Sequence, residues 1–202
     1  MKRALMFVVA GIFALMLIGA IAVYVIGQRT PTKDPVVKQP TSAEGADSDE
    51  RLIFPELVGT SLLLEQVSVP SELSGDFKLV VVSYDVSQQP DIDEWLPALE
   101  ELNEEFPRMA GYYIPLLPKS AADTSVFIIG GMAAVAKSDV DRARTVVVFT
   151  NVEAFNRLVN VPNMEAVQLF LLDQNQRILW QGSGHYNENT LDELRAALQS
   201  TL

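Results

Sequence analysis

An uncharged apolar run near the N-terminus constrains this chain more than any other feature of the sequence. Residues 4–26 are 23 consecutive positions without a charged side chain, and Lys2 and Arg3 precede them. A helix of that length crosses the roughly 30 Å hydrocarbon core of a bilayer. A cleaved secretory signal is the alternative, because residues 20–22 offer a small-x-small cleavage pattern. The run continues beyond that pattern, so we expect an uncleaved transmembrane anchor over residues 1–27.

The charges beside this run bear on its orientation. Lys2, Arg3 and the free amino terminus favour a cytoplasmic N-terminus. The opposite orientation stays open, because Arg29, Lys33 and Lys38 follow the span. We expect a single-pass protein of the cell membrane whose C-terminal domain lies outside the cytoplasm.

Composition separates a linker from a domain. Residues 28–50 are polar, rich in Pro, Ser and Asp, and lack apolar periodicity, which is typical of a flexible linker. Residues 1–50 hold five basic and five acidic side chains, whereas residues 51–202 hold ten basic and twenty-one acidic ones. The net charge of −11 therefore lies on the domain. Such a surface repels phosphate backbones at long range, so we do not expect this domain to bind nucleic acid.

The chain contains no cysteine. Disulfides, thiolate nucleophiles, zinc–thiolate sites and thiol redox cycling all require this residue, so none of them is available. The remaining sequence indicates no bound cofactor.

Apolar runs typical of buried strands alternate with helical patterns along residues 51–202. A loop with one short strand is expected in 52–69, and further strands in 77–84, 110–117, 145–150, 167–172 and 177–181. Helices are expected at Asp91–Phe106, 121–141, Glu153–Val159 and Thr190–Leu202. The N-caps expected for the first and last of these helices are Asp91 or Asp93, and Thr190. The order β-α-β-α-β-α-β-β-α predicts an α/β fold with a mixed central sheet and helices on both faces.

Two apolar features bear on packing. Trp95, Leu96, Leu99, Leu102 and Phe106 recur on one expected helix face, which predicts burial of Trp95. The stretch Val126–Ala136 is too short to span a bilayer, so we expect a core-facing or interfacial helix there.

The order of elements resembles the thioredoxin-like fold over roughly residues 53–202. In membrane-tethered reductases of that fold, a strand runs into W-C-P-x-C, and a helix beginning E-x-P-x-L follows. Residues 94–99 are similar, although Pro97 follows Glu94 by three positions rather than two. The family's interval from this proline places the two thiol positions at about Gln89 and Ile92. The resemblance therefore implies a degenerate active site made of Gln89, Pro90, Asp91 and Ile92.

The C-terminal part resembles the thioredoxin-like chaperones that assist assembly of the mitochondrial F-type ATP synthase. In that family an apolar strand ends in an aspartate, a turn follows, and an R-I-R-W-x-x-x-G-like strand leads to a helix. The positions that match are Arg177, Ile178, Trp180 and Gly184, whereas Leu179 departs from the second arginine. The resemblance implies a protein partner and a role as an assembly or chaperone-like factor for a membrane complex.

Candidate surface and site residues cluster near the expected thiol positions and near the C-terminal hairpin. A candidate interaction surface comprises Asp85, Arg177, Trp180 and His185. The only histidine, His185, is either a general base, since an ordinary histidine titrates near pH 6.5, or a polar loop residue. Asp91, Asp93 and Glu94 either interact with a helix dipole or form a hard-cation site.

The features together predict a membrane-anchored, redox-inactive thioredoxin-like domain that acts in protein interaction and is not an enzyme. Two alternatives remain open. One is a hydrolase or metal-dependent enzyme that uses the acidic cluster near Asp91 with His185. The other is a small-molecule binding module in the cleft at the degenerate active site.

Overall fold

The computed structural model describes residues 52–201. The expected anchor, residues 4–26, and the expected linker, residues 28–50, lie outside that range. No helix formed by residues 52–201 combines the length and the apolar character needed to cross a bilayer.

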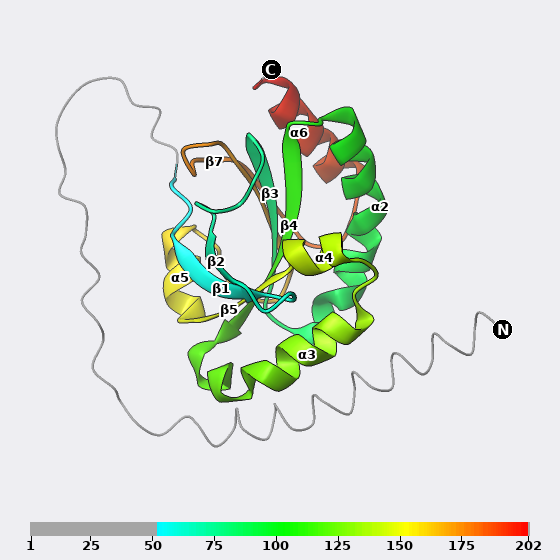
Figure 1. The fold of residues 1–202 in the computed structure, drawn as a ribbon. Helices are drawn as coiled ribbons and strands as arrows, with labels where there is room; N and C mark the ends of the chain where they lie inside the picture. The colour runs from blue at the N-terminus through cyan, green and yellow to red at the C-terminus, as the bar shows by residue number, and fades with distance from the viewer. Residues whose placement is uncertain (1–51, 202) are drawn as a thin grey trace.

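A seven-stranded mixed sheet forms the centre of the domain, with strand order β2-β1-β5-β4-β3-β6-β7 (Figure 1). Strands β3, β4 and β5 are parallel to one another, and β6 and β7 join them as an antiparallel hairpin. The strands are β1 (Leu57–Ser61), β2 (Gln66–Val69), β3 (Phe77–Ser83), β4 (Met109–Pro118), β5 (Val146–Thr150), β6 (Gln168–Leu172) and β7 (Ile178–Ser183). Every residue of β6 is buried, as expected for an apolar strand covered on both faces.

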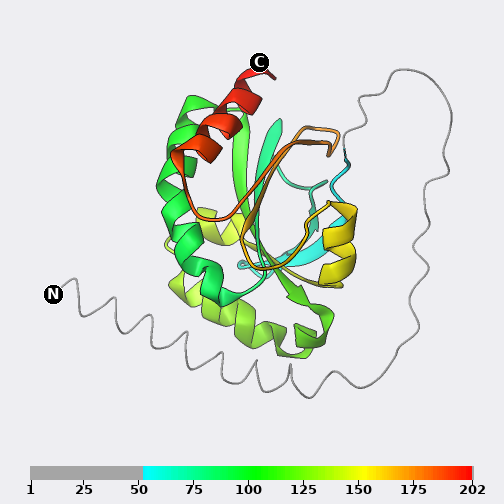
Figure 2. The ribbon, with the colours of Figure 1, turned by 180° about the vertical axis from the view of Figure 1, so that it is seen from behind.

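Helices cover both faces of the sheet, which confirms the predicted α/β architecture. Helices α2 and α6 lie on one face and α5 on the other, as Figures 1 and 2 show. The helices are α2 (Gln89–Glu105), α3 (Ser125–Val135), α4 (Asp139–Arg144), α5 (Val152–Leu158) and α6 (Glu188–Gln199). Two 3-10 turns, η1 (Val86–Gln88) and η2 (Lys119–Thr124), precede α2 and α3.

The two faces of the sheet bury separate apolar layers. Under α5, the rings of Phe155 and Phe170 both meet Phe54 edge to face, with centroids 5.5 and 5.3 Å from the Phe54 ring. Under α2 and α6, Trp95 is completely buried, as the sequence predicts. Burial of such large aromatic side chains dominates the stability of a core.

Residues 52–69 contain two strands, so the prediction of a loop with one strand is wrong. Strands β1 and β2 form an antiparallel hairpin, and the turn between them contains Leu62, Leu63 and Leu64. Leu64 adopts a positive φ of 66°, which lets the chain reverse there. An apolar turn carries none of the Gly, Asn or Asp signals that mark most hairpins, and this concealed it.

The single helix predicted over 121–141 is also wrong. Helix α3 ends at Val135, and Ala136 is extended, with φ −62° and ψ 133°. A new helix, α4, then begins because the side chain of Ser138 caps it and accepts a hydrogen bond from the amide of Asp141 (3.1 Å). The chain therefore forms two helices, α3 and α4, instead of one continuous helix.

The predicted caps of α2 and α6 are wrong by a few residues. Helix α2 begins at Gln89 with Pro90 in its first turn, and the carboxylate of Asp85 instead caps the preceding turn η1. Helix α6 is capped by Asn187, whose Oδ1 accepts from the amide of Thr190 (2.9 Å). Leu96, expected on the buried face of α2, is 37% exposed.

Candidate functional site

The end of β3 leads through one turn into Gln89 to Ile92, the residues that the resemblance predicts to be a degenerate active site. The Oδ1 atom of Asp85 accepts a hydrogen bond from the amide of Ser87 (2.7 Å), which turns the chain through η1. Gln89, Pro90, Asp91 and Ile92 then form the first turn of α2. This places the four residues at a helix N-terminus beyond the carboxyl end of a central strand, a position where α/β folds commonly bind ligands.

Gln88 fixes this junction, although nothing in the sequence singled it out. Its side chain is buried, with 5% of its area exposed. Its Oε1 accepts from the amide of Tyr84 and its Nε2 donates to the carbonyl of Met164, each at 2.8 Å. One side chain therefore connects the end of β3, the start of α2 and the loop before β6.

Two tyrosines at the same end of the sheet are held by hydrogen bonds. The Tyr84 hydroxyl donates to Oδ1 of Asn156 on α5 (2.8 Å), and burial raises the pKa of Tyr84 well above its ordinary value. The hydroxyl groups of Ser83 and Tyr113 lie 2.7 Å apart, and burial raises the pKa of Tyr113 to about 12. Both phenols are therefore neutral hydrogen-bonding groups at physiological pH.

The loop after β7 packs against the first turns of α2. The carboxylate of Asp91 lies 2.7 Å from Nδ1 of His185, and Nε1 of Trp95 donates to the carbonyl of Gly184 (3.0 Å). The ring of Tyr186 meets Trp95 edge to face at 5.3 Å. These contacts hold the loop in place over the start of α2.

The structure distributes the predicted site residues over several environments. Ile92 is 4% exposed and belongs to the core, whereas Gln89 donates to Asp93 on the surface of α2 (2.9 Å). Asp91 meets His185, as the enzyme alternative requires. Within residues 52–201, however, no three His, Asp and Glu side chains are grouped so that they could hold a metal ion.

The four residues of the candidate interaction surface do not lie together. Asp85 and His185 are at the end of the sheet where α2 begins. Trp180 is half-buried on the α2 and α6 face. Arg177 precedes β7, and its amide donates to Asp173 in the hairpin turn (2.9 Å), so it lies at the opposite end of that strand from His185.

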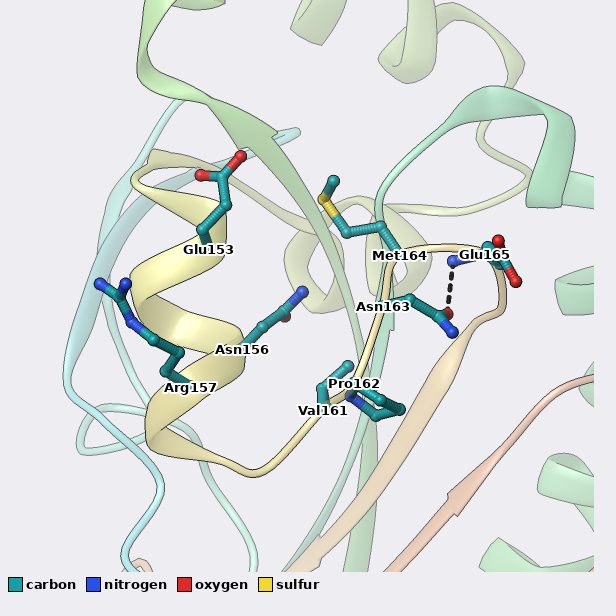
Figure 3. Close-up of a pocket in the computed structure, with 8 residues that line it drawn as sticks. All are labelled: Glu153, Asn156, Arg157, Val161, Pro162, Asn163, Met164 and Glu165. Atoms are coloured by element: carbon teal, nitrogen blue, oxygen red, sulfur yellow. Dashed lines mark hydrogen bonds between the residues drawn. The ribbon is translucent and has the colours of Figure 1, made fainter.

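A surface pocket of about 520 Å³ lies between α5 and the loop before β6, and none of the residues Gln89 to Ile92 lines it (Figure 3). Its lining comes from α5 and the loop before β6, and comprises Glu153, Asn156, Arg157, Val161, Pro162, Asn163, Met164 and Glu165. Asn156 is 6% exposed, its Oδ1 is engaged by Tyr84, and its Nδ2 has no hydrogen-bond partner within residues 52–201. Figure 3 shows this amide pointing from α5 toward the loop, whereas Arg157 points away. No motif in the sequence marked these residues, because a lone asparagine in a short helix has no characteristic spacing.

The fold is similar to solved structures of Sco proteins. BsSco, a member of the Sco family of cytochrome c oxidase assembly proteins, gives a TM-score of 0.50 at 11% identity, over 76% of this chain and 98% of that one. Yeast Sco1 with copper bound gives 0.50 at 12% identity, over 75% of this chain and 95% of that one. Arabidopsis thaliana ScoI with copper bound gives 0.50 at 9% identity, over 73% and 99%.

These identities establish the fold alone. No protein-family model matches the sequence, and no curated protein matches it. The likeness shows that residues 52–201 have the thioredoxin-like fold that their element order predicts, and these residues include no thiol at the start of α2. The resemblance to ATP synthase assembly chaperones stays a prediction.

Proposed function

We propose that this chain is a membrane-tethered, redox-inactive thioredoxin-like domain that binds a protein partner, as an assembly or chaperone-like factor for a membrane complex. The observation that carries the proposal is that residues other than cysteine occupy the predicted thiol positions, and that hydrogen bonds to neighbouring loops hold this helix start in place. Gln89-Pro90-Asp91-Ile92 stand where a thiol pair is expected, and Gln88 and Trp95 bond this helix start to two neighbouring loops. A fixed surface of this kind is suited to binding, because its side chains lose little conformational freedom when a partner docks.

The likeness to Sco proteins supports an assembly role without supporting their copper. BsSco belongs to a family of cytochrome c oxidase assembly proteins, and two of the similar structures contain copper. Soft thiolate ligands favour Cu(I), and this chain has no cysteine. Its one histidine already contacts Asp91 through Nδ1. The residues present therefore do not fit a thiolate copper site, and the proposal includes no metal.

The tether is the second part of the proposal. The uncharged run at residues 4–26 has the length of a membrane-spanning helix, and Lys2 and Arg3 favour a cytoplasmic N-terminus. The domain then lies outside the cytoplasm, joined to the anchor by the polar residues 28–50. A binding domain held in this way meets partners that are themselves in or on the membrane.

Site-specific photo-crosslinking in native membranes tests the proposal. A photoreactive side chain replaces Ser87 or His185, which are exposed beside the degenerate site, and Glu104, exposed near the other end of α2, is the matched control. We expect one membrane protein to be captured from Ser87 and His185 and not from Glu104. Equal capture from all three positions, or none from the first two, would contradict the proposal.

The pocket beside α5 supports a second candidate, a small-molecule binding function. Its volume of about 520 Å³ falls in the range of ligand sites, and the buried Asn156 presents a free amide donor to it. A thermal-shift screen of small carbonyl and carboxylate compounds tests this candidate. A hit whose effect disappears in Asn156→Ala would support it, and a screen without hits would count against it.

A further inference from the structure

Helix α3 is apolar around its whole circumference but is covered on only one side. Between Ser125 and Val135 it carries no charged residue. Only Ile129 is buried, in a small cluster with Leu62 and Val147. A helix that is hydrophobic all round normally lies in a core or in a membrane environment, so its uncovered side requires an explanation.

The uncovered side is a continuous apolar strip. Val126 and Phe127 are 77% and 73% exposed, and Val135 is 42% exposed. At 100° per residue, Gly130 and Ala134 fall between them on the same half of the helix, and both are exposed. A Cβ atom at Gly130 would meet nothing within 4 Å. Exposed apolar patches of this kind mark interaction sites.

The charges around α3 differ from those of the rest of the domain. Exposed Lys119 begins η2, six residues before α3, and exposed Lys137 follows the end of α3 by two residues, while Asp123 is the one acidic residue between these lysines. Asp139, the next acidic residue, is paired with Arg142 (2.8 Å). Elsewhere the domain is strongly acidic and is repelled by anionic surfaces. The two lysines flank an exposed apolar surface, and the long side chain of lysine can reach lipid phosphates while its neighbours contact the acyl chains.

The tether keeps this strip close to a bilayer. Residues 28–51 separate the expected anchor from the first described residue, and 24 residues span at most about 85 Å. In Figures 1 and 2, α3 lies at the outer edge of the domain, with no other described element beyond it. The start of α2 lies at the same end of the domain in both views.

We propose that the exposed strip of α3 rests in the interface of the bilayer that holds the anchor, with Lys119 and Lys137 near the lipid phosphates. The inference rests on the proposed tether. Contact through α3 orients the domain, and it brings the degenerate active site at the start of α2 to the membrane surface. A partner of the domain would then be recognised close to the bilayer.

The absence of cysteine makes a direct test straightforward, because one introduced cysteine is the only labelling site. The full chain carrying Phe127→Cys is labelled with a nitroxide and reconstituted in phosphatidylcholine vesicles. The control is Leu158→Cys, which is 57% exposed on α5, across the sheet from α3. Collision rates are measured with oxygen, which partitions into lipid, and with a nickel chelate, which stays in water.

We expect the label at position 127 to collide more with oxygen and less with the nickel chelate than the label at position 158, each by about twofold or more. Adding Val126→Asp should abolish this difference while the circular dichroism spectrum stays unchanged. Equal water exposure at both positions, in chains that float with the vesicles, would overturn the lipid contact and leave the tether standing.

Two other outcomes separate the remaining explanations. Spin–spin broadening at position 127 that disappears on dilution with unlabelled chain would assign the strip to a second copy and overturn the inference. Chains that fail to float with vesicles after alkaline extraction would overturn the tether, and the lipid contact with it.

Discussion

The carboxylate of Asp91 lies 2.7 Å from Nδ1 of His185 and thereby connects the first turn of α2 to the loop after β7. The side chain of His185 is 79% exposed, whereas that of Asp91 is only 15% exposed. The pair therefore lies at the surface, where His185 is exposed to solvent and Asp91 is mostly buried. Surface pairs contribute little to stability, so we assign this contact to positioning the loop over the degenerate active site.

Removing this pair should cost little. We predict that Asp91→Asn and His185→Gln each lower the free energy of unfolding by at most about 1 kcal/mol. Their coupling in a double-mutant cycle should shrink in 1 M salt, because salt screens exposed charges. Urea unfolding followed by circular dichroism measures both effects. A coupling of several kcal/mol, or metal that copurifies and is lost in both variants, would favour the enzyme alternative.

Gln88 and Gln89 make a matched pair of neighbours. Gln88 is buried and makes two hydrogen bonds to backbone groups, whereas Gln89 makes one to a surface carboxylate. We predict that Gln88→Ala lowers the free energy of unfolding by about 2 to 3 kcal/mol, because it leaves the buried amide of Tyr84 unpaired. Gln89→Ala should cost less than about 0.5 kcal/mol. Similar losses for the two variants, measured by urea unfolding, would show that Gln88 does not brace the junction.

Trp95 should be the costliest side chain to shorten near the site. It is completely buried and donates to the carbonyl of Gly184. We predict a loss of about 3 to 5 kcal/mol for Trp95→Ala and about 2 to 3 kcal/mol for Trp95→Phe, which removes the hydrogen bond and also leaves part of the ring volume empty. Trp180→Phe is the control, because Trp180 is half-buried. A control that costs as much as Trp95→Phe, by thermal or urea unfolding, would argue against the role of the Gly184 bond.

Two strand glycines differ in the space around them. A Cβ atom at Gly59 in β1 would lie 2.6 Å from Cγ1 of Val146 and 2.8 Å from the carbonyl oxygen of Val147, whereas one at Gly111 would meet nothing within 4 Å. We predict that Gly59→Ala destabilises the domain by about 1 to 3 kcal/mol through overpacking. Gly111→Ala should be neutral or slightly stabilising. Equal melting temperatures of the two variants would contradict the close approach of β1 and β5.

Acid should weaken one surface interaction in a defined direction. Hydrogen bonds from Arg108 and Gln174 hold the pKa of Asp76 below its ordinary value of 3.8. A carboxylate with a lowered pKa stabilises the fold above its unfolded pKa, and this contribution disappears as the pH falls through the folded pKa. Asp76→Asn should therefore be less stable than the wild type at neutral pH, and the difference should shrink below about pH 4.

Urea unfolding across this pH range measures the effect, with Asp123→Asn as the control for an exposed aspartate that has no ion pair within residues 52–201. A difference between Asp76→Asn and the wild type that stays constant down to about pH 2 would show that the carboxylate is not the source.

Local patterns in the sequence predicted the strands of the core well. The runs at 77–84, 145–150 and 167–172 correspond to β3, β5 and β6 within a residue or two. Buried strands consist of nearly continuous apolar and β-branched residues, which a sequence displays directly. The turns and helix caps were predicted less well from the sequence. Leu62 to Leu64 form a turn without turn residues, and Ser138 divides a helix through one hydrogen bond that periodicity does not reveal.

The candidate site was only partly predictable. The resemblance placed the degenerate positions at Gln89 to Ile92, which form the first turn of α2, and their descent from a thiol site stays a prediction. Gln88 and Asn156 were missed, because a polar side chain acquires its role from partners that lie far away in the sequence. Gln88 bonds a residue 76 positions away, and Trp95 one that is 89 positions away.

The missing cysteines exclude disulfide exchange before any fold is known, because a chain without cysteine cannot carry it out in any conformation. Periodicity also determined the order of most elements. Only the tertiary structure decided that α3 is left uncovered on one side, and that Asp91 and His185 meet. The exposure of α3 and the contact between Asp91 and His185 both depend on how helices and loops pack against the sheet. Packing between segments that are distant in the sequence leaves no local signal in it.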